Sequence, residues 1–148
     1  MSATLPDACA TEALGAALAG LAEPGDVVTL SGPLGAGKTS IARGLLAALG
    51  LAGEAPSPTF AIVQPYAPPE VRFPVLHVDL YRIDDPDEMA ELGLDEAAMD
   101  SLLLVEWPER APGHWPEALA LTLAILPDGT RGLTAMVPPG WKARWSQI

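Results

Sequence analysis

The sequence has 148 residues, a length that suits one domain with a single core and leaves no room for a second. Gly (14) and Pro (16) are frequent, yet 49% of the chain is hydrophobic, which excludes a disordered protein and indicates a loop-rich globular one. The formal net charge of −11 is the wrong sign for a protein that grips a nucleic-acid backbone through its own surface.

Cysteine content and apolar run lengths favour a cytoplasmic protein without a membrane segment. Cys9 is the lone cysteine, so it forms no internal disulfide, and we expect it to be buried or half-buried on a helix. Residues 1–7 do not resemble a secretion signal. The longest apolar runs, residues 44–53 and 118–126, are shorter than the roughly 20 residues that span a bilayer.

The first half of the chain predicts a helix, a strand and a second helix in that order. Asp7 is a candidate N-cap, and residues 7–21 carry apolar side chains at helical spacing. Residues 27–31 form a β-branched apolar run that predicts a strand before a glycine-rich loop. Residues 39–49 predict a helix that Gly50 ends. The apolar stripe expected on the first helix consists of Ala10, Ala13, Leu14, Ala17, Leu18 and Leu21.

The second half predicts further strands, one short helix and a hairpin. Residues 60–64 and 75–79 read as strands, and residues 85–92 carry an acidic N-cap followed by Pro, typical of a short helix start. Residues 102–105 are all apolar and end at Glu106, which indicates a buried strand. Residues 118–126 and 133–137 flank a Pro-Asp-Gly turn and predict an antiparallel hairpin. Residues 138–148 are expected to pack loosely or fray.

The strongest motif is a complete G-x-x-x-x-G-K-T pattern between the predicted strand and helix. Its glycines let backbone N–H groups surround phosphate, Lys38 reaches the β and γ phosphates, and the Thr39 hydroxyl ligates Mg²⁺. The strand-loop-helix order therefore predicts an α/β fold, a three-layer P-loop domain over residues 1–148 with a largely parallel central sheet and a closing antiparallel hairpin. The predicted phosphate-binding segment is Gly32, Pro33, Leu34, Gly35, Ala36, Gly37, Lys38, Thr39 and Ser40.

Two acids at strand ends are candidates for metal binding or for orienting water. Asp79 and Glu106 each follow an apolar run, and the carboxyl ends of parallel strands collect ligands. The alternative for each acid is a structural role, in which its side chain only caps the next turn. His77 alternates with Asp79 along the strand, but a lone strand histidine is more often structural.

Sequence elements that are absent narrow the class of nucleotide-binding protein. The chain contains no Asn, so the Asn-Lys-x-Asp element that reads guanine is absent, which favours ATP. A small-molecule kinase, the main alternative, would need a second pocket and usually a lid that supplies Arg, whereas the arginines here are scattered singly. A nucleotide-gated binding module without turnover is the other alternative.

Four motifs together resemble the bacterial TsaE (YjeE) family, small P-loop ATPases that take part in making threonylcarbamoyl-adenosine beside the anticodon of certain tRNAs. The resemblance runs from the first helix to the hairpin, and all but the first motif are specific to the family. In chain order the motifs are Gly35-Ala36-Gly37-Lys38-Thr39, Ser57-Pro58-Thr59-Phe60, His77-Val78-Asp79-Leu80-Tyr81-Arg82 and Glu106-Trp107-Pro108-Glu109.

The resemblance implies a role for each matching residue. Lys38 and the loop would hold the ATP phosphates, Thr39 and Glu106 would hold Mg²⁺, and Asp79 would be a second acid that places the metal or the attacking water. Pro33 departs from the acidic residue usual in the family, at a position that need not touch phosphate. Ser57 and Thr59 would lie on a switch loop, while Thr11, Gly129, Thr130 and Arg131 would flank the base or ribose.

The resemblance also implies partners. Family members work with TsaB and TsaD, which carry the tRNA and the threonylcarbamoyl transfer, so ATP hydrolysis, slow alone, would be stimulated by these proteins and drive a step of the assembly. Contact with tRNA would be indirect, which agrees with the net charge. Residues 84–100 hold eight carboxylates and no basic side chain, which indicates a solvated helix face or a surface for a basic partner.

Overall fold

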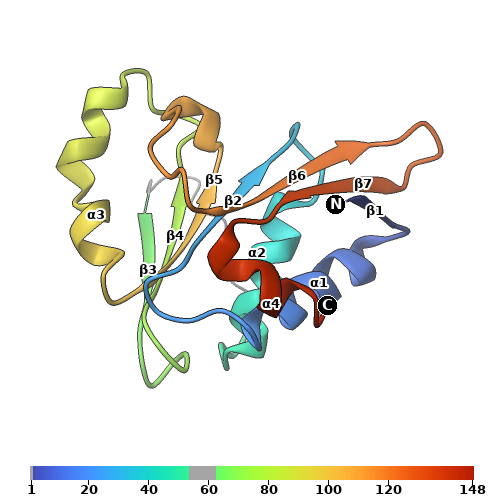
Figure 1. The fold of residues 1–148 in the computed structure, drawn as a ribbon, viewed down its shortest axis with the longest axis horizontal. Helices are drawn as coiled ribbons and strands as arrows, with labels where there is room; N and C mark the ends of the chain where they lie inside the picture. The colour runs from blue at the N-terminus through green and yellow to red at the C-terminus, as the bar shows by residue number, and fades with distance from the viewer. Residues whose placement is uncertain (1, 54–62) are drawn as a thin grey trace.

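The computed structural model describes residues 2–53 and 63–148, and in this part of the chain seven strands form one mixed sheet (Figure 1). The strand order is β1-β7-β6-β2-β5-β4-β3. The strands are β1 (Ser2–Leu5), β2 (Val27–Ser31), β3 (Val63–Tyr66), β4 (Val75–Asp79), β5 (Leu102–Glu106), β6 (Leu119–Ile125) and β7 (Arg131–Met136). The helical segments are α1 (Ala8–Ala19), α2 (Lys38–Ala48), η1 (Pro86–Leu92), α3 (Leu94–Ala97), η2 (Pro108–Arg110), η3 (Pro139–Trp141) and α4 (Lys142–Trp145).

The centre of the sheet is parallel, as predicted. Strands β6, β2, β5 and β4 pair in parallel, while β7 closes on β6 as an antiparallel hairpin and β3 pairs antiparallel at the other edge. Every residue of β5 is buried, because a central parallel strand is covered on both faces. The parallel arrangement brings the carboxyl ends of β2, β4 and β5 to one edge, beside the loop that enters α2.

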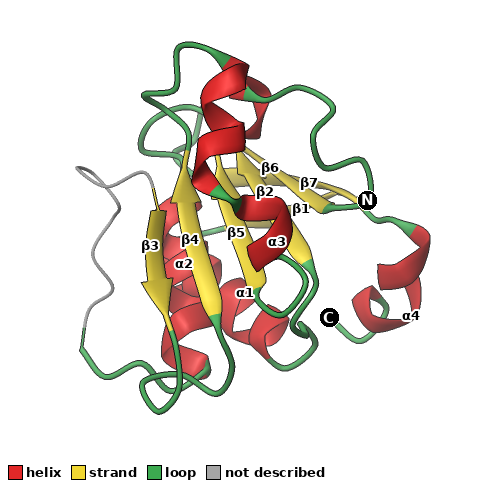
Figure 2. Ribbon diagram, turned by 90° about the vertical axis from the view of Figure 1, so that its left-hand side faces the viewer, coloured by secondary structure: helices red, strands yellow, loops and turns green. Residues whose placement is uncertain are grey.

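Helices cover both faces of the sheet (Figure 2): α1 and α2 lie on one face, and η1 and α3 on the other. Two apolar clusters match these layers, a larger one that includes α1 and α2 and a smaller one around Val105 and Leu94. Gly15 and Gly44 let the two long helices approach closely, since a methyl group at either position would overlap the backbone oxygen of Ile41 or Glu12. The three-layer α/β prediction is confirmed.

The first helix has its predicted start, but the predicted apolar stripe is partly wrong. The Asp7 side chain caps α1 by accepting a hydrogen bond of 2.8 Å from the Ala10 amide. Ala13 and Ala17 are exposed, and Cys9, expected to be at least half-buried, is exposed as well. The buried face of α1 is rotated, because Gly15 at the helix contact fixes which side packs on α2; it consists of Thr11, Leu14, Gly15, Leu18 and Ala19.

The ends of the chain differ from the sequence prediction. Residues 2–5 form β1 against β7, an edge strand that the sequence did not indicate. The C-terminal segment was expected to pack loosely, yet Trp141 and Trp145 are buried in the larger core cluster. Arg144 fixes this segment through hydrogen bonds of 2.6 and 3.1 Å to the Asp26 carboxylate, because a bidentate guanidinium pair holds both partners in one orientation.

Two other predicted elements have shifted bounds. The strand expected at residues 60–64 is β3 at Val63–Tyr66, and residues 60–62 lie outside the described part of the chain. The short helix at residues 86–92 is present as a 3₁₀ segment, with the Asp85 side chain accepting from the Asp87 amide at 3.0 Å. Ser57 and Thr59, the predicted switch residues, also lie outside the described residues.

Candidate functional site: a phosphate loop beside a buried carboxylate

The loop between β2 and α2 has the backbone that its glycines predict. Gly32, Gly35 and Gly37 have φ values of 142°, 78° and 109°, a region that other residues rarely adopt. Gly37 is the N-cap of α2 and offers no side chain, so the first N–H groups of this helix have no side-chain cap. Free N–H groups at the positive end of an 11-residue helix form a binding site for an anion.

Lys38 is buried at the start of α2, where its ammonium group faces the loop. The Nζ atom donates hydrogen bonds to the carbonyl oxygens of Gly32 and Pro33, and it lies 3.7 Å from the centre of the Trp107 ring. Burial is the largest influence and leaves the pKa of Lys38 below its ordinary value, and the negative charges of Glu106, Glu109 and Asp79 oppose this shift only in part. These acids thus favour a charged Lys38 beside the loop.

Glu106 is the buried acid of the site, with 2% of its surface exposed at the end of β5. Its Oε1 atom accepts a hydrogen bond of 3.2 Å from the Thr39 hydroxyl, so two of the predicted metal ligands are adjacent. Its Oε2 atom lies 2.6 Å from Nε2 of His77 on β4. The site therefore contains a carboxylate that Thr39 contacts from the loop side and His77 from within the sheet.

Asp79 lies at the end of β4 and is half-buried, with its Cα opposite that of Glu106. Its Oδ1 atom accepts a hydrogen bond of 2.9 Å from the Tyr81 amide. Burial raises the pKa of the Asp79 carboxyl, the Tyr81 hydrogen bond opposes that effect, and the charge of Glu106 adds to it. Both predicted acids, Lys38 and Thr39 line one recess of about 250 Å³.

Replacing Asp79 with Asn is expected to stabilise the protein at neutral pH, by no more than about 1 kcal/mol because solvent screens a half-exposed group. The folded-state pKa is raised, so ionised Asp79 costs stability above that pKa, and the cost vanishes below the unfolded-state pKa, where both states bind the proton. Asn retains the oxygen that accepts from Tyr81. Urea unfolding across a pH series should show a gain at neutral pH that fades in acid. A loss at neutral pH would contradict this.

A second recess of about 260 Å³ lies on the other side of the loop, between α1 and the β6–β7 turn. Thr11, Ser40, Gly129 and Arg131 line it together with loop glycines, and three of these, Thr11, Gly129 and Arg131, are among the residues predicted to flank the base or ribose. Arg131 ties the turn to the loop by donating to the Gly129 and Gly35 carbonyl oxygens at 2.6 and 3.2 Å. Thr130 lines neither recess, and its hydroxyl donates to Asp128 at 2.6 Å.

Comparison with known proteins decides the family. A family model described as "Threonylcarbamoyl adenosine biosynthesis protein TsaE" matches residues 5–132. The chain belongs to the TsaE family. The tRNA threonylcarbamoyladenosine biosynthesis protein TsaE of Streptomyces coelicolor is 47% identical over 97 residues, which cover 65% of this chain and 66% of that protein. The Bacillus subtilis TsaE protein is 38% identical over 126 residues, which cover 84% of this chain and 77% of that protein.

A solved structure shows the same fold. The crystal structure of Bacillus subtilis YdiB matches with a TM-score of 0.82 and 29% sequence identity, over 99% of this chain and 92% of that chain. The predicted family and its P-loop fold are thus confirmed, and this TsaE fold implies nucleotide binding. No helix in the described part of the chain has the length and apolar character needed to cross a membrane.

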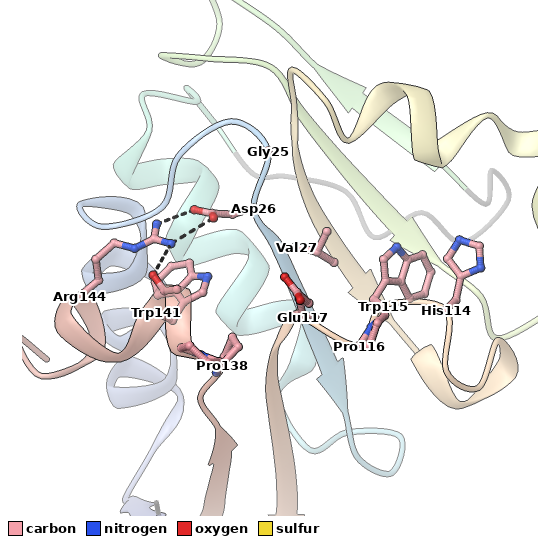
Figure 3. Close-up of a pocket in the computed structure, with 13 residues that line it drawn as sticks. Gly25, Asp26, Val27, His114, Trp115, Pro116, Glu117, Pro138, Trp141 and Arg144 are labelled. Atoms are coloured by element: carbon pink, nitrogen blue, oxygen red, sulfur yellow. Dashed lines mark hydrogen bonds and ion pairs between the residues drawn. The ribbon is translucent and has the colours of Figure 1, made fainter.

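Another cavity of this TsaE-family protein, of about 490 Å³, lies away from the phosphate loop (Figure 3). It lies between the residues that enter β2, the loop before β6 and the C-terminal segment, and none of the described predicted site residues lines it. Two of its charged groups are paired with each other, since Arg144 binds Asp26 and stacks 3.9 Å from the centre of the Trp141 ring. The predicted site residues instead gather in the two recesses around the loop.

Two side chains of the site make contacts that the sequence did not specify. His77 was expected to be structural, and the structure shows that its ring contacts the Glu106 carboxylate. Trp107 is half-buried, has a φ of 60° and lies against the Lys38 ammonium group, a contact that the sequence did not indicate. The useful signal for His77 was its position two residues before Asp79, because residues i and i+2 of a strand share a face.

Proposed function

We propose that this protein is an ATPase of the threonylcarbamoyl-adenosine pathway, which binds MgATP at residues 32–40 and hydrolyses it slowly when alone. The observation that carries the proposal is the Thr39–Glu106 contact of 3.2 Å directly beside the loop and Lys38. Oxygen ligands next to a phosphate-binding loop are what a magnesium nucleotide requires. Membership of the TsaE family supports the same activity.

Each proposed residue has a separate task. Lys38 and the loop N–H groups bind and orient the phosphates, while Thr39, Glu106 and Asp79 hold Mg²⁺, with Asp79 or Glu106 orienting water. Bound Mg²⁺ supplies positive charge to the phosphate oxygens. Magnesium usually takes one or two carboxylates plus phosphate and water.

The other proposed nucleotide contacts are those to the base and ribose. Thr11, Ser40, Gly129 and Arg131 line the second recess, which lies directly beside Gly35, Ala36 and Gly37. Thr130 and Thr59 remain proposals from the family resemblance.

The proposed partners are TsaB and TsaD, which would stimulate hydrolysis in the cytoplasm and carry the tRNA. The net charge of −11 supports indirect contact with tRNA, because the phosphate backbone repels an acidic surface. In this scheme ATP hydrolysis drives turnover of the modifying assembly and does not itself alter the RNA.

The pathway assignment is tested in bacterial cells depleted of their own TsaE. Expression of this chain should restore threonylcarbamoyl-adenosine in total tRNA, measured by mass spectrometry of the nucleosides, whereas the Lys38→Ala variant should not restore it. Full restoration by Lys38→Ala would contradict a role for ATP in the pathway. Absence of restoration by the wild-type chain, with TsaB and TsaD from its own organism supplied, would contradict the pathway assignment.

A further inference from the structure

His77 and Glu106 form a buried pair inside the sheet, with 1% and 2% of their surfaces exposed. The register of β4 and β5 places His77 opposite Leu104, so its side chain reaches diagonally to Glu106 on the same face, with 2.6 Å between Nε2 and Oε2. Among the hydrogen bonds to Glu106 in the described part of the chain, this one is the shortest. The Thr39 hydroxyl lies 3.2 Å from Oε1 and 3.5 Å from Oε2.

A buried carboxylate requires hydrogen-bond donors, because it has lost its hydrogen bonds to water and burying it without replacements costs several kcal/mol of folding free energy, on the order of the desolvation penalty. The oxygen can only accept, so Nε2 of His77 carries the proton and donates it. The other ring nitrogen, Nδ1, is buried and has no hydrogen-bond partner within the described residues. The ring therefore makes one polar contact in the described structure, and that contact is with Glu106.

We propose that His77 is a positioning residue for the divalent cation. This role rests on the proposed MgATP site. The Nε2 hydrogen bond holds Oε2 of Glu106 in place, and Oε1 therefore stays directed at Thr39. A hydrogen-bonded neighbour that fixes the orientation of a metal ligand raises metal affinity. The His77 side chain thereby sets how tightly the site binds its cation without contacting the nucleotide.

The test measures Mn²⁺ binding by electron paramagnetic resonance, with the protein saturated by a non-hydrolysable ATP analogue. His77→Leu should weaken Mn²⁺ affinity by about 10- to 100-fold, as loss of such a neighbour typically does. His77→Gln should stay within about threefold of wild type, because its amide nitrogen lies at the distance of Nε2. His77→Asn should behave like His77→Leu, since its shorter amide places nitrogen at the Nδ1 position.

The only other histidine provides a matched control. His114 contacts Asp95 at 2.9 Å on the surface, so His114→Leu should leave Mn²⁺ affinity unchanged. Equal losses in the Gln and Asn variants, or wild-type affinity in a folded His77→Leu variant, would overturn the role of His77 alone. Absence of Mn²⁺ binding by the wild-type protein with the analogue would overturn the proposed MgATP site, and this role with it.

Discussion

ATP affinity is expected to fall by about 10- to 150-fold when Lys38 is replaced by Ala. A hydrogen bond from a charged donor contributes about 1.5 to 3 kcal/mol, and 1.4 kcal/mol corresponds to a factor of ten. Lys38 is buried at the loop, where its ammonium group is held by two carbonyl oxygens and the Trp107 ring. Calorimetric titration with MgATP, together with circular dichroism to verify folding, measures this effect.

The sequence contains one other lysine, which serves as the control. Lys142 is exposed in the C-terminal segment, so Lys142→Ala removes the same charge far from the loop and should leave ATP affinity unchanged. If Lys38→Ala were folded and bound ATP as wild type does, the phosphate site would not be at this loop. A similar loss in both variants would show that net charge, and not the position of Lys38, governs binding.

The turnover of ATP is expected to fall by about 100- to 1000-fold in the Glu106→Gln variant, the loss typical when one group that stabilises transition-state charge is removed. Gln keeps the size of the side chain and an oxygen that accepts from Thr39 or His77, so packing in β5 is preserved. What disappears is the negative charge that would hold Mg²⁺. Phosphate release at saturating ATP measures the effect.

Glu109 provides the matched control for this change. It is exposed three residues further along, in η2, and does not line the recess, so Glu109→Gln removes an equal charge that acts on Lys38 only through space and should retain most of the turnover. If Glu106→Gln hydrolysed ATP at the wild-type rate, Glu106 would be only a structural acid. The Asp79→Asn variant then becomes the main test of which carboxylate serves the reaction.

The loop and its acids could be predicted because their signals are local. The spacing of Gly32, Gly37 and Lys38 specifies a strand-loop-helix unit, and an all-apolar run ending in Glu106 indicates a buried strand with an acid at its edge. Those elements then place Asp79 and Glu106 side by side, because neighbouring parallel strands end at the same edge of the sheet.

The features that escaped prediction depend on contacts between distant segments. The strand β1 is short and mostly exposed, and its pairing with β7 joins residues on opposite ends of the chain. Trp141 and Trp145 are buried because the C-terminal segment returns to the core, which no local pattern specifies. The contact of His77 with Glu106 depends on the register of β4 against β5.

We propose that this site hydrolyses MgATP and that the partner proteins stimulate the hydrolysis. Release of inorganic phosphate from ATP, measured for the purified protein alone and then with TsaB, TsaD and tRNA, tests that claim most directly. We expect slow release alone, a clear increase with the partners, and loss of both in Lys38→Ala. Release that is indifferent to the partners, or that persists in Lys38→Ala, would contradict the claim.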